Sequence, residues 1–244
     1  VKTLPAELTL VSCSWEDEAG SIDEQNPTFS QVKLTAKKLA GLTAGISVEL
    51  LMDTSMDIVS MLTEQFMYAM GLELDNQALN GTGSPCSGVL SAAAGYSVIL
   101  ATGSSNFSSI TADKLSEMIY KLSEEDAVNA TFVYNRLIQH YIRTLKDSNN
   151  QYIWQKPGEG KPGTIWELPY IQSTKATGTT AASTPFAALG NWKYFYVGRR
   201  MGAMAFAADP YTNFATDLVR FRAITRWGMA IARATAFVRL LTNS

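Results

Sequence analysis

"FSQVKLTAKKLAGLTAGISVELLMD" (residues 29–53) joins a strand pattern to a helix pattern within one short stretch. Polar and apolar residues alternate over 31–42, and three lysines fall on this segment, which predicts a strand. Ser47 then opens a helical pattern. The stretch holds no histidine, no cysteine and no other residue arranged for catalysis. The stretch therefore predicts a strand followed by a helix, and it contains no candidate catalytic site.

A long helix follows this stretch. Asp53 and Ser55 are both suitable N-caps, and Asp57 would sit in the first turn, where the helix dipole favours an anion. No proline interrupts residues 56–79, and a helix of that length would be about 36 Å long at 1.5 Å per residue. "NGTGSP" (80–85) ends it with turn-forming residues. One face carries recurring apolar residues: Ile58, Met61, Leu62, Phe66, Ala69 and Leu72.

The rest of the chain mixes helices and strands. Thr111 and Asn135 are positioned to cap two further helices, with a buried strand at 130–135 between them. Strand-like runs follow from 151 onward, and the chain ends in what the pattern predicts to be two long strands that turn near Trp227 and Gly228. Because strands and helices do not alternate regularly, an α+β fold is expected rather than a doubly wound sheet.

Composition bounds the function. The 244 residues are 46% apolar and 17% charged, so the chain can bury a sizeable core, and its net charge of −2 does not favour steering toward nucleic acid. Cys13 and Cys86 have neither metal-ligand spacing nor a disulfide framework and are expected to be reduced, structural residues. The sequence shows no membrane-spanning run and no signal peptide.

The charges are divided between the two ends. Residues 3–32 contain no lysine or arginine, whereas no acid follows Asp217. Charge runs of this kind are usually solvated faces, but the two surfaces could also meet, within one chain or between chains. The acids are Glu7, Glu16, Asp17, Glu18, Asp23 and Glu24, and the cations are Arg220, Arg222, Arg226, Arg233 and Arg239.

The sequence gives no support for an enzyme. His140, the single histidine, lies mid-helix between Arg136 and Arg143, so an exposed structural role is expected and imidazole-based metal sites are excluded by count. "GTGSPCSG" (81–88) follows a helix rather than a strand and matches no phosphate-binding loop, which indicates a connecting turn. Neither a catalytic residue, a cofactor nor a metal is expected. The methionines at helical spacing are interpreted as packing residues: Met56, Met61, Met67 and Met70.

Several segments, in order, resemble the major capsid proteins of tailed phages and prophages, the HK-97 fold family. The first is "WEDEAGSIDEQNPTFSQVKLTAKKLAGLTAGISVELLMDT" (15–54), in which a Trp-x-x-Glu, an acidic arm, Pro-Thr-Phe and a lysine-rich strand lead into the long helix. The resemblance covers essentially the whole chain. The later segments are "LNGTGSPCSGVL", "FVYNRLIQHYIRTLKDSNNQYIW", "IWELPYIQST", "LGNWKYFYVGRR" and "VRFRAITRWGMAIARATAFVRLL".

The resemblance implies an HK-97-type α+β capsid fold in three parts. Residues 12–33 would form the extended loop that reaches over a neighbouring subunit. Residues 34–85 and 213–244 would form the peripheral domain, with the long helix as its spine, and residues 86–212 the axial domain. A loop at the capsomer axis would contain Lys156, Pro157, Gly158, Glu159, Gly160 and Lys161.

The function implied is a major capsid protein that self-assembles into hexamers and pentamers of an icosahedral shell enclosing double-stranded phage DNA. The implied partners are further copies of the chain, non-specifically bound DNA on the inner face, a portal and a scaffolding protein or segment, and a decoration protein in some shells, with no membrane. The location would be the virion, after assembly in the bacterial cytoplasm. The alternatives are an encapsulin-like nanocompartment shell that encloses protein cargo and, in another class, a carboxylate hydrolase.

Contacts between subunits are expected to involve the acidic arm and the C-terminal arginines. The arm residues are Trp15, Glu16, Asp17, Glu18 and Phe29, and the arginines are Arg220, Arg222 and Arg226, which even spacing places on one face of a strand. The alternative is that these arginines face the shell interior and its DNA.

The chain departs from the family pattern in two ways. The family usually has an N-terminal arm, often preceded by a scaffolding segment that is removed by proteolysis, and the sequence is interpreted as a mature form lacking most of that arm. Some members also join subunits by lysine–asparagine isopeptide bonds with the help of a glutamate. The three corresponding positions here are Ile22, Asp217 and Ile224, which cannot perform that reaction.

We therefore predict that no covalent bonds join the subunits. Ile22 has no nucleophile, and no lysine within residues 3–32 could replace it. Assemblies boiled in detergent should give one monomer band near 26.6 kDa, or above it if the chain carries more residues at its N-terminus, on a denaturing gel. A ladder of covalent multimers would contradict this.

Overall fold

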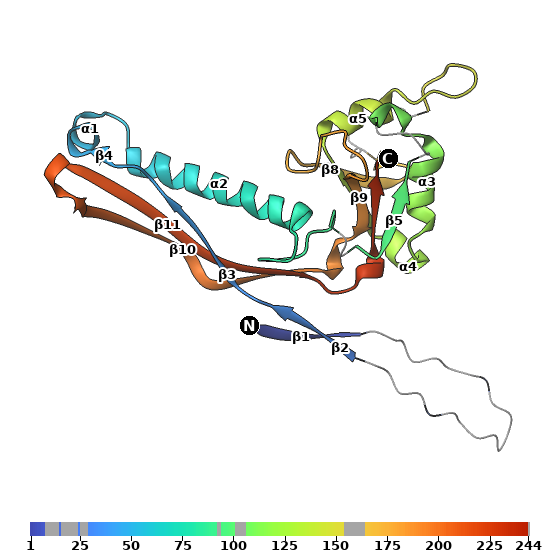
Figure 1. Cartoon of the computed structure of the whole chain (residues 1–244), viewed down its shortest axis with the longest axis horizontal. Helices are drawn as coiled ribbons and strands as arrows, with labels where there is room; N and C mark the ends of the chain where they lie inside the picture. The colour runs from blue at the N-terminus through green and yellow to red at the C-terminus, as the bar shows by residue number, and fades with distance from the viewer. Residues whose placement is uncertain are drawn as a thin grey trace.

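The structure is a computed structural model (Figure 1), in which the described residues form three sheets. A two-stranded ribbon pairs β1 with β2, a four-stranded sheet has the order β10-β11-β3 with β4 also paired to β11, and a six-stranded sheet has the order β5-β12-β9-β6-β8-β7. The expected mixture of helices and strands is confirmed. The structure describes residues 1–7, 15, 24, 29–91, 94–100, 106–153 and 164–243.

The four-stranded sheet is built on two long antiparallel strands, β10 (Phe195–Asn213) and β11 (Leu218–Ile231). β3 (Lys37–Leu42) and β4 (Ile46–Ser47) pair antiparallel with β11 on its other edge. Figure 1 shows α2 (Ile58–Asn80) running along one side of these strands. The prediction of a turn near Trp227 was wrong, because β11 runs straight through it. The turn lies instead at η3 (Phe214–Thr216) and at Asp217, whose φ is 51°.

Aromatic packing fixes α2 on the sheet. Phe66 of α2 meets Phe206 edge to face at 6.1 Å between ring centroids, and Phe206 stacks on Phe221 at 5.6 Å. Gly41 of β3 makes room for this contact, since a Cβ there would lie 2.7 Å from Phe66 Cε1. The Phe66 ring of α2 can therefore pack against β3 because residue 41 has no side chain.

The helix starts differ slightly from the sequence expectation. Ser47 caps the short α1 (Val48–Asp53), and Asp57 rather than Asp53 or Ser55 caps α2. The Asp57 carboxylate accepts hydrogen bonds from the side chain and backbone of Ser60 and from the backbone of Val59, and these bonds hold the pKa of Asp57 below its ordinary value. α1 and α2 are thus two capped helices separated by a short break.

The six-stranded sheet forms the second unit with its own core. Phe107, Phe132, Phe186 and Leu240 are fully buried within it. Thr111 and Asn135 cap α3 and α5, as predicted. The helices are η1 (Phe107–Ser109), α3 (Ala112–Tyr120), α4 (Glu124–Ala127), α5 (Arg136–Arg143), η2 (Trp192–Tyr194) and η4 (Ala234–Ala236). The strands are β5 (Tyr96–Ile99), β6 (Ala130–Tyr134), β7 (Thr164–Ile165), β8 (Leu168–Gln172), β9 (Pro185–Asn191) and β12 (Phe237–Leu241).

The sheets divide the chain at positions other than those expected from the sequence. β10 belongs to the four-stranded sheet, although residues 86–212 were expected to form the axial domain. β12 belongs to the six-stranded sheet, although 213–244 was expected to complete the peripheral domain. The four-stranded sheet therefore joins β3 and β4 to the consecutive strands β10 and β11, and the six-stranded sheet is completed by β12, which follows β11 in the chain.

The ribbon consists of β1 (Lys2–Glu7) and β2 (Phe29–Leu34), paired antiparallel from Lys2 opposite Leu34 to Glu7 opposite Phe29. It projects away from the four-stranded sheet (Figure 1). The expected extended loop, 12–33, falls largely outside the described residues. Its described base also includes residues 2–7, which the sequence reading did not assign to it.

A partly buried ion pair joins the segment after β11 to α4 of the six-stranded unit. Arg233, which follows β11, pairs through Nη2 with the Asp126 carboxylate of α4. Ser123 Oγ donates to the same carboxylate at 2.9 Å and Asn191 Nδ2 at 3.4 Å, while the Arg233 guanidinium lies 4.1 Å from the centre of the Tyr194 ring. Asp126 is 2% exposed, so this carboxylate depends on these partners in place of water.

Replacing Asp126 with alanine should lower the free energy of unfolding by about 3 kcal/mol, because Arg233 would lose its buried counter-charge. The loss is expected at the low end of the range for such pairs, since the Arg233 side chain is still 30% exposed and can be hydrated. Urea denaturation would measure it. Glu125→Ala, an exposed neighbour on the same helix, is the matched control, and equal losses for the two variants would contradict the assignment.

Candidate assembly surfaces

The single histidine and the described cysteine are the first candidates for a catalytic role. His140 is exposed on α5, as expected. Cys86 is buried, its Sγ donates to the backbone oxygen of Gln77 at 3.2 Å, and desolvation raises the pKa of its thiol, so it is not a reactive nucleophile. Across the described part of the chain, no group of three or more His, Cys, Asp or Glu side chains could hold a metal ion.

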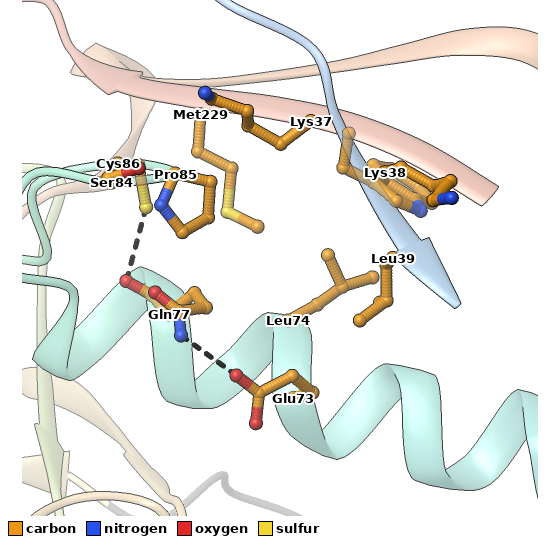
Figure 2. Close-up of a pocket in the computed structure, with 11 residues that line it drawn as sticks. Lys37, Lys38, Leu39, Glu73, Leu74, Gln77, Ser84, Pro85, Cys86 and Met229 are labelled. Carbon is orange, nitrogen blue, oxygen red and sulfur yellow. Dashed lines mark hydrogen bonds between the residues drawn. The ribbon is translucent and has the colours of Figure 1, made fainter. Parts of the chain in front are cut away.

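A cavity of about 250 Å³ lies between α2, β3, β11 and residues 84–86. Figure 2 shows Leu39, Leu74, Pro85 and Met229 around it, with the carboxylate of Glu73 accepting a hydrogen bond from Gln77 at 2.8 Å. Lys37 and Lys38 also line the cavity, and Glu73 is the one carboxylate among its lining residues. The cavity is an apolar joint, and the segment 81–88 that closes it is the connecting turn predicted from the sequence.

The arginines of β11 do share one face. Phe221, Ala223 and Thr225 are buried toward α2, so the intervening residues lie on the opposite side of the sheet. On that side Arg222 and Arg226 are exposed and Arg220 is half-buried. The predicted common face of Arg220, Arg222 and Arg226 is therefore confirmed.

Two more cations of this face were missed by the sequence reading. Arg226 stands directly opposite Arg200 of β10 on one side and Lys38 of β3 on the other. Residues opposite one another on neighbouring strands share a face, so the three form one row. Lysine and arginine were visible at 38 and 200, but only the register of three strands distant in sequence brings them together.

The N-terminal contact residues are only partly described. Trp15 is fully exposed, at 103%, and Phe29 lies in β2 opposite Glu7. Glu16, Asp17 and Glu18, together with the expected axis loop 156–161, lie outside the described residues.

A pair of glycines lets the ribbon leave the sheet. Gly198 and Gly228 stand opposite each other on β10 and β11. A Cβ at Gly228 would lie 3.1 Å from the backbone carbon of Thr35 and 3.2 Å from the backbone nitrogen of Ala36. The link between β2 and β3 therefore crosses the sheet at the one place where neither strand has a side chain.

Large apolar side chains are exposed along α1 and α2. Among the four methionines expected to pack, only Met70 is buried, while Met56, Met61 and Met67 are exposed at 71%, 45% and 54%. The expectation was wrong for these three because the sheet covers only one side of α2. At the far end of the sheet, further exposed apolar residues gather on α1 and the β10–β11 turn: Leu50, Met52, Tyr211 and Phe214. Exposed apolar patches of this kind mark interaction surfaces.

Comparison with known proteins agrees with this architecture. A family model described as the phage capsid family matches residues 3–241. The major capsid protein of Enterobacteria phage HK97 is 28% identical over 220 residues, which cover 88% of this chain and 54% of that protein, so the chain spans about half the length of this relative.

Solved structures share the fold at low sequence identity. The capsid of a native GTA particle matches with a TM-score of 0.85 and 19% identity, covering 100% of this chain and 85% of that one. A structure from Gordonia phage Cozz matches with a TM-score of 0.71 and 17% identity, covering 99% and 81% of the two chains. No helix among the described residues is long and apolar enough to cross a membrane.

Valine in place of Gly228 should displace the ribbon from the sheet, because its side chain would overlap Thr35 and Ala36. We expect a loss of about 1–3 kcal/mol in unfolding free energy and faster hydrogen exchange at 29–36, with the six-stranded sheet unchanged. Gly202→Val on β10 is the control, since nothing lies within 4 Å of a Cβ there. Unchanged exchange at 29–36 in Gly228→Val would contradict the crossing as the ribbon's anchor.

Proposed function

Because the chain belongs to the phage capsid family, we propose that it assembles into hexamers and pentamers of an icosahedral shell that encloses double-stranded DNA. The subunit is a building element of the virion and performs no catalysis. Its main partners are further copies of itself. The shell forms in the bacterial cytoplasm, where a portal and a scaffolding protein or segment take part, and a decoration protein binds some shells of this kind.

The β1–β2 ribbon is the observation that supports this proposal most directly. A two-stranded ribbon is at best marginally stable by itself in water. This ribbon projects from its own sheet (Figure 1), and the segment it supports includes Trp15, which is fully exposed. Trp15, which its own subunit leaves uncovered, is explained if the arm packs on a second copy, since buried aromatic side chains often dominate interfaces.

The exposed apolar residues of α1 and α2 support the same proposal. α2 carries apolar residues nearly all round, yet only Leu62, Met70 and Leu79 are buried. A helix of this kind is normally covered on more than one side. Neighbouring subunits in a shell would supply the missing cover without any further domain of the chain.

The arginine face of β11 is the proposed acceptor of the acidic arm. Arg220, Arg222 and Arg226 lie on the exposed side of the sheet, and the arm of a neighbour brings Glu16, Asp17 and Glu18 next to Trp15. A single exposed ion pair contributes only about 0–1 kcal/mol. A shell repeats the contact in every subunit, so the small contributions add up over the assembly.

Electron microscopy of purified assemblies tests the proposed function. Closed icosahedral shells with nuclease-protected DNA and a portal vertex are expected. Shells filled with protein would indicate a nanocompartment, and a monomer with an acidic cleft would revive the hydrolase alternative.

Deletion of residues 17–27 tests the arm separately. The variant should remain folded and soluble, with an unchanged circular dichroism spectrum, because all three described sheets keep their strands. It should form no closed shells, as judged by sedimentation and electron microscopy. Normal shells from this variant would show that the arm is not the connecting element.

A further inference from the structure

The three cations Arg200, Arg226 and Lys38 form a row across neighbouring strands β10, β11 and β3. All three side chains are exposed on the face of the sheet that lies away from α2. Like charges directly opposite each other on adjacent strands destabilise the pairing. The isolated subunit therefore keeps an unfavourable arrangement of like charges in its four-stranded sheet.

No described acid neutralises this row. The ion pairs found among the described residues join Lys114 and Lys121 to Glu117, and Arg233 to Asp126. Further positive charge lies next to the row, because Lys2 and Arg200 line a hollow of about 440 Å³ that the glycine pair also lines. Arg199 lines this hollow too, but its guanidinium lies over the Trp227 ring, 5.5 Å from the ring centre. The row and the hollow together gather four cations where the ribbon leaves the sheet: Lys2, Lys38, Arg200 and Arg226.

The other two arginines of this face, Arg220 and Arg222, have no like charge directly opposite them. Arg220 stands opposite Asp209, whose pKa is lowered first by the hydrogen bond from Thr212 and, among smaller causes, by the charge of Arg220. Arg222 stands between Ala207 and Leu42, which are uncharged. The need for a negative partner is therefore concentrated at Arg226 and its two neighbours.

We propose that the row Arg200–Arg226–Lys38 is the specific site that receives the carboxylates of residues 16–24 from a second copy of the chain. This inference rests on the proposed shell function and refines it, since it moves the centre of the contact from Arg220 and Arg222 to a row that includes two residues outside β11. The positively charged hollow beside the row extends the same site.

Charge and shape both favour this occupant. Residues 3–32 contain no lysine or arginine, and five acids fall within 16–24. Beside the row, Ala40, Leu42 and Ile224 share its face, and Leu42 is 63% exposed. Positions two apart on a strand are about 7 Å from each other, so an apolar strip begins one step from the cations. The arm has the matching order, with Trp15 followed directly by three acids.

The proposal predicts effects of opposite sign on the free and the assembled protein. Replacing Arg226 with glutamine removes repulsion in the unassembled subunit, whose melting temperature should rise by about 1–3 °C. The same change removes the partner of the acids, so the protein concentration needed for assembly should rise by about tenfold. A merely structural arginine would move both measurements toward lower stability.

Arg220→Gln is the matched control, because it lies on the same strand and face but has Asp209 opposite. It should not raise the melting temperature and should affect assembly less than Arg226→Gln. A charge exchange completes the test: Arg226→Glu should block assembly, and Glu16→Lys with Asp17→Lys in the same chain should restore it in part. Raising salt from 0.1 to 1 M, which shortens the screening length from about 10 to about 3 Å, should weaken wild-type assembly more than that of Arg226→Gln.

Three results would overturn the inference while leaving the shell function intact, as long as the wild type forms closed shells. The first is a lower melting temperature for Arg226→Gln. The second is no rescue by the charge exchange. The third is normal assembly of Arg226→Gln with reduced protection of DNA from nuclease, which would assign the row to phosphates of the packaged nucleic acid. Failure of the wild type to form shells would instead overturn the proposed function itself.

Discussion

The pairing of β10 with β11 is the constraint on which the other parts of the molecule depend. These two strands pair from Phe195 opposite Ile231 to Asn213 opposite Leu218, with two irregularities on the way. One edge of β11 holds β3 and β4, one face of the pair supports α2, and the chain passes from its end through Arg233 into the six-stranded sheet. Because successive side chains of a strand point to opposite faces, this one register decides which residues are buried against α2 and which cations face outward.

The sequence predicted the parts of the fold that are set locally. N-caps at Thr111 and Asn135 and the long α2 follow from hydrogen-bonding side chains and from the absence of proline, both of which act within one or two turns. The turn was misplaced at Trp227 and Gly228 because glycine commonly marks a turn, whereas Gly228 is needed for the crossing chain at Thr35. A glycine required by a distant segment cannot be distinguished from a turn glycine without that segment.

The candidate site, too, could be predicted from the sequence only where it depends on residues close together in the chain. The common face of Arg220, Arg222 and Arg226 could be predicted, because it depends only on the spacing of two within one strand. The contributions of Arg200 and Lys38 could not, because they depend on how β10 and β3 are aligned with β11. The exposure of Met56, Met61 and Met67 was missed for a related reason. Helical spacing identifies a possible packing face, but only the tertiary arrangement decides whether a partner covers it within the same chain.

The two broad sides of the four-stranded sheet also differ in charge, and this difference limits how copies can combine. No lysine or arginine lies between Lys38 and Lys114, so α1 and α2 themselves carry acids, uncharged polar residues and exposed apolar residues but no cation. The opposite side carries Lys38, Arg200, Arg222 and Arg226. Contact between two copies through identical cationic faces would repeat the repulsion already present in the row, whereas contact with an acidic segment relieves it. Like-charge repulsion therefore disfavours the symmetric face-to-face pair and is compatible with the proposed contact, in which each copy would offer its arm to one neighbour and its sheet to another, head to tail. A ring closed by such contacts would leave neither an arm nor a cationic face without its partner.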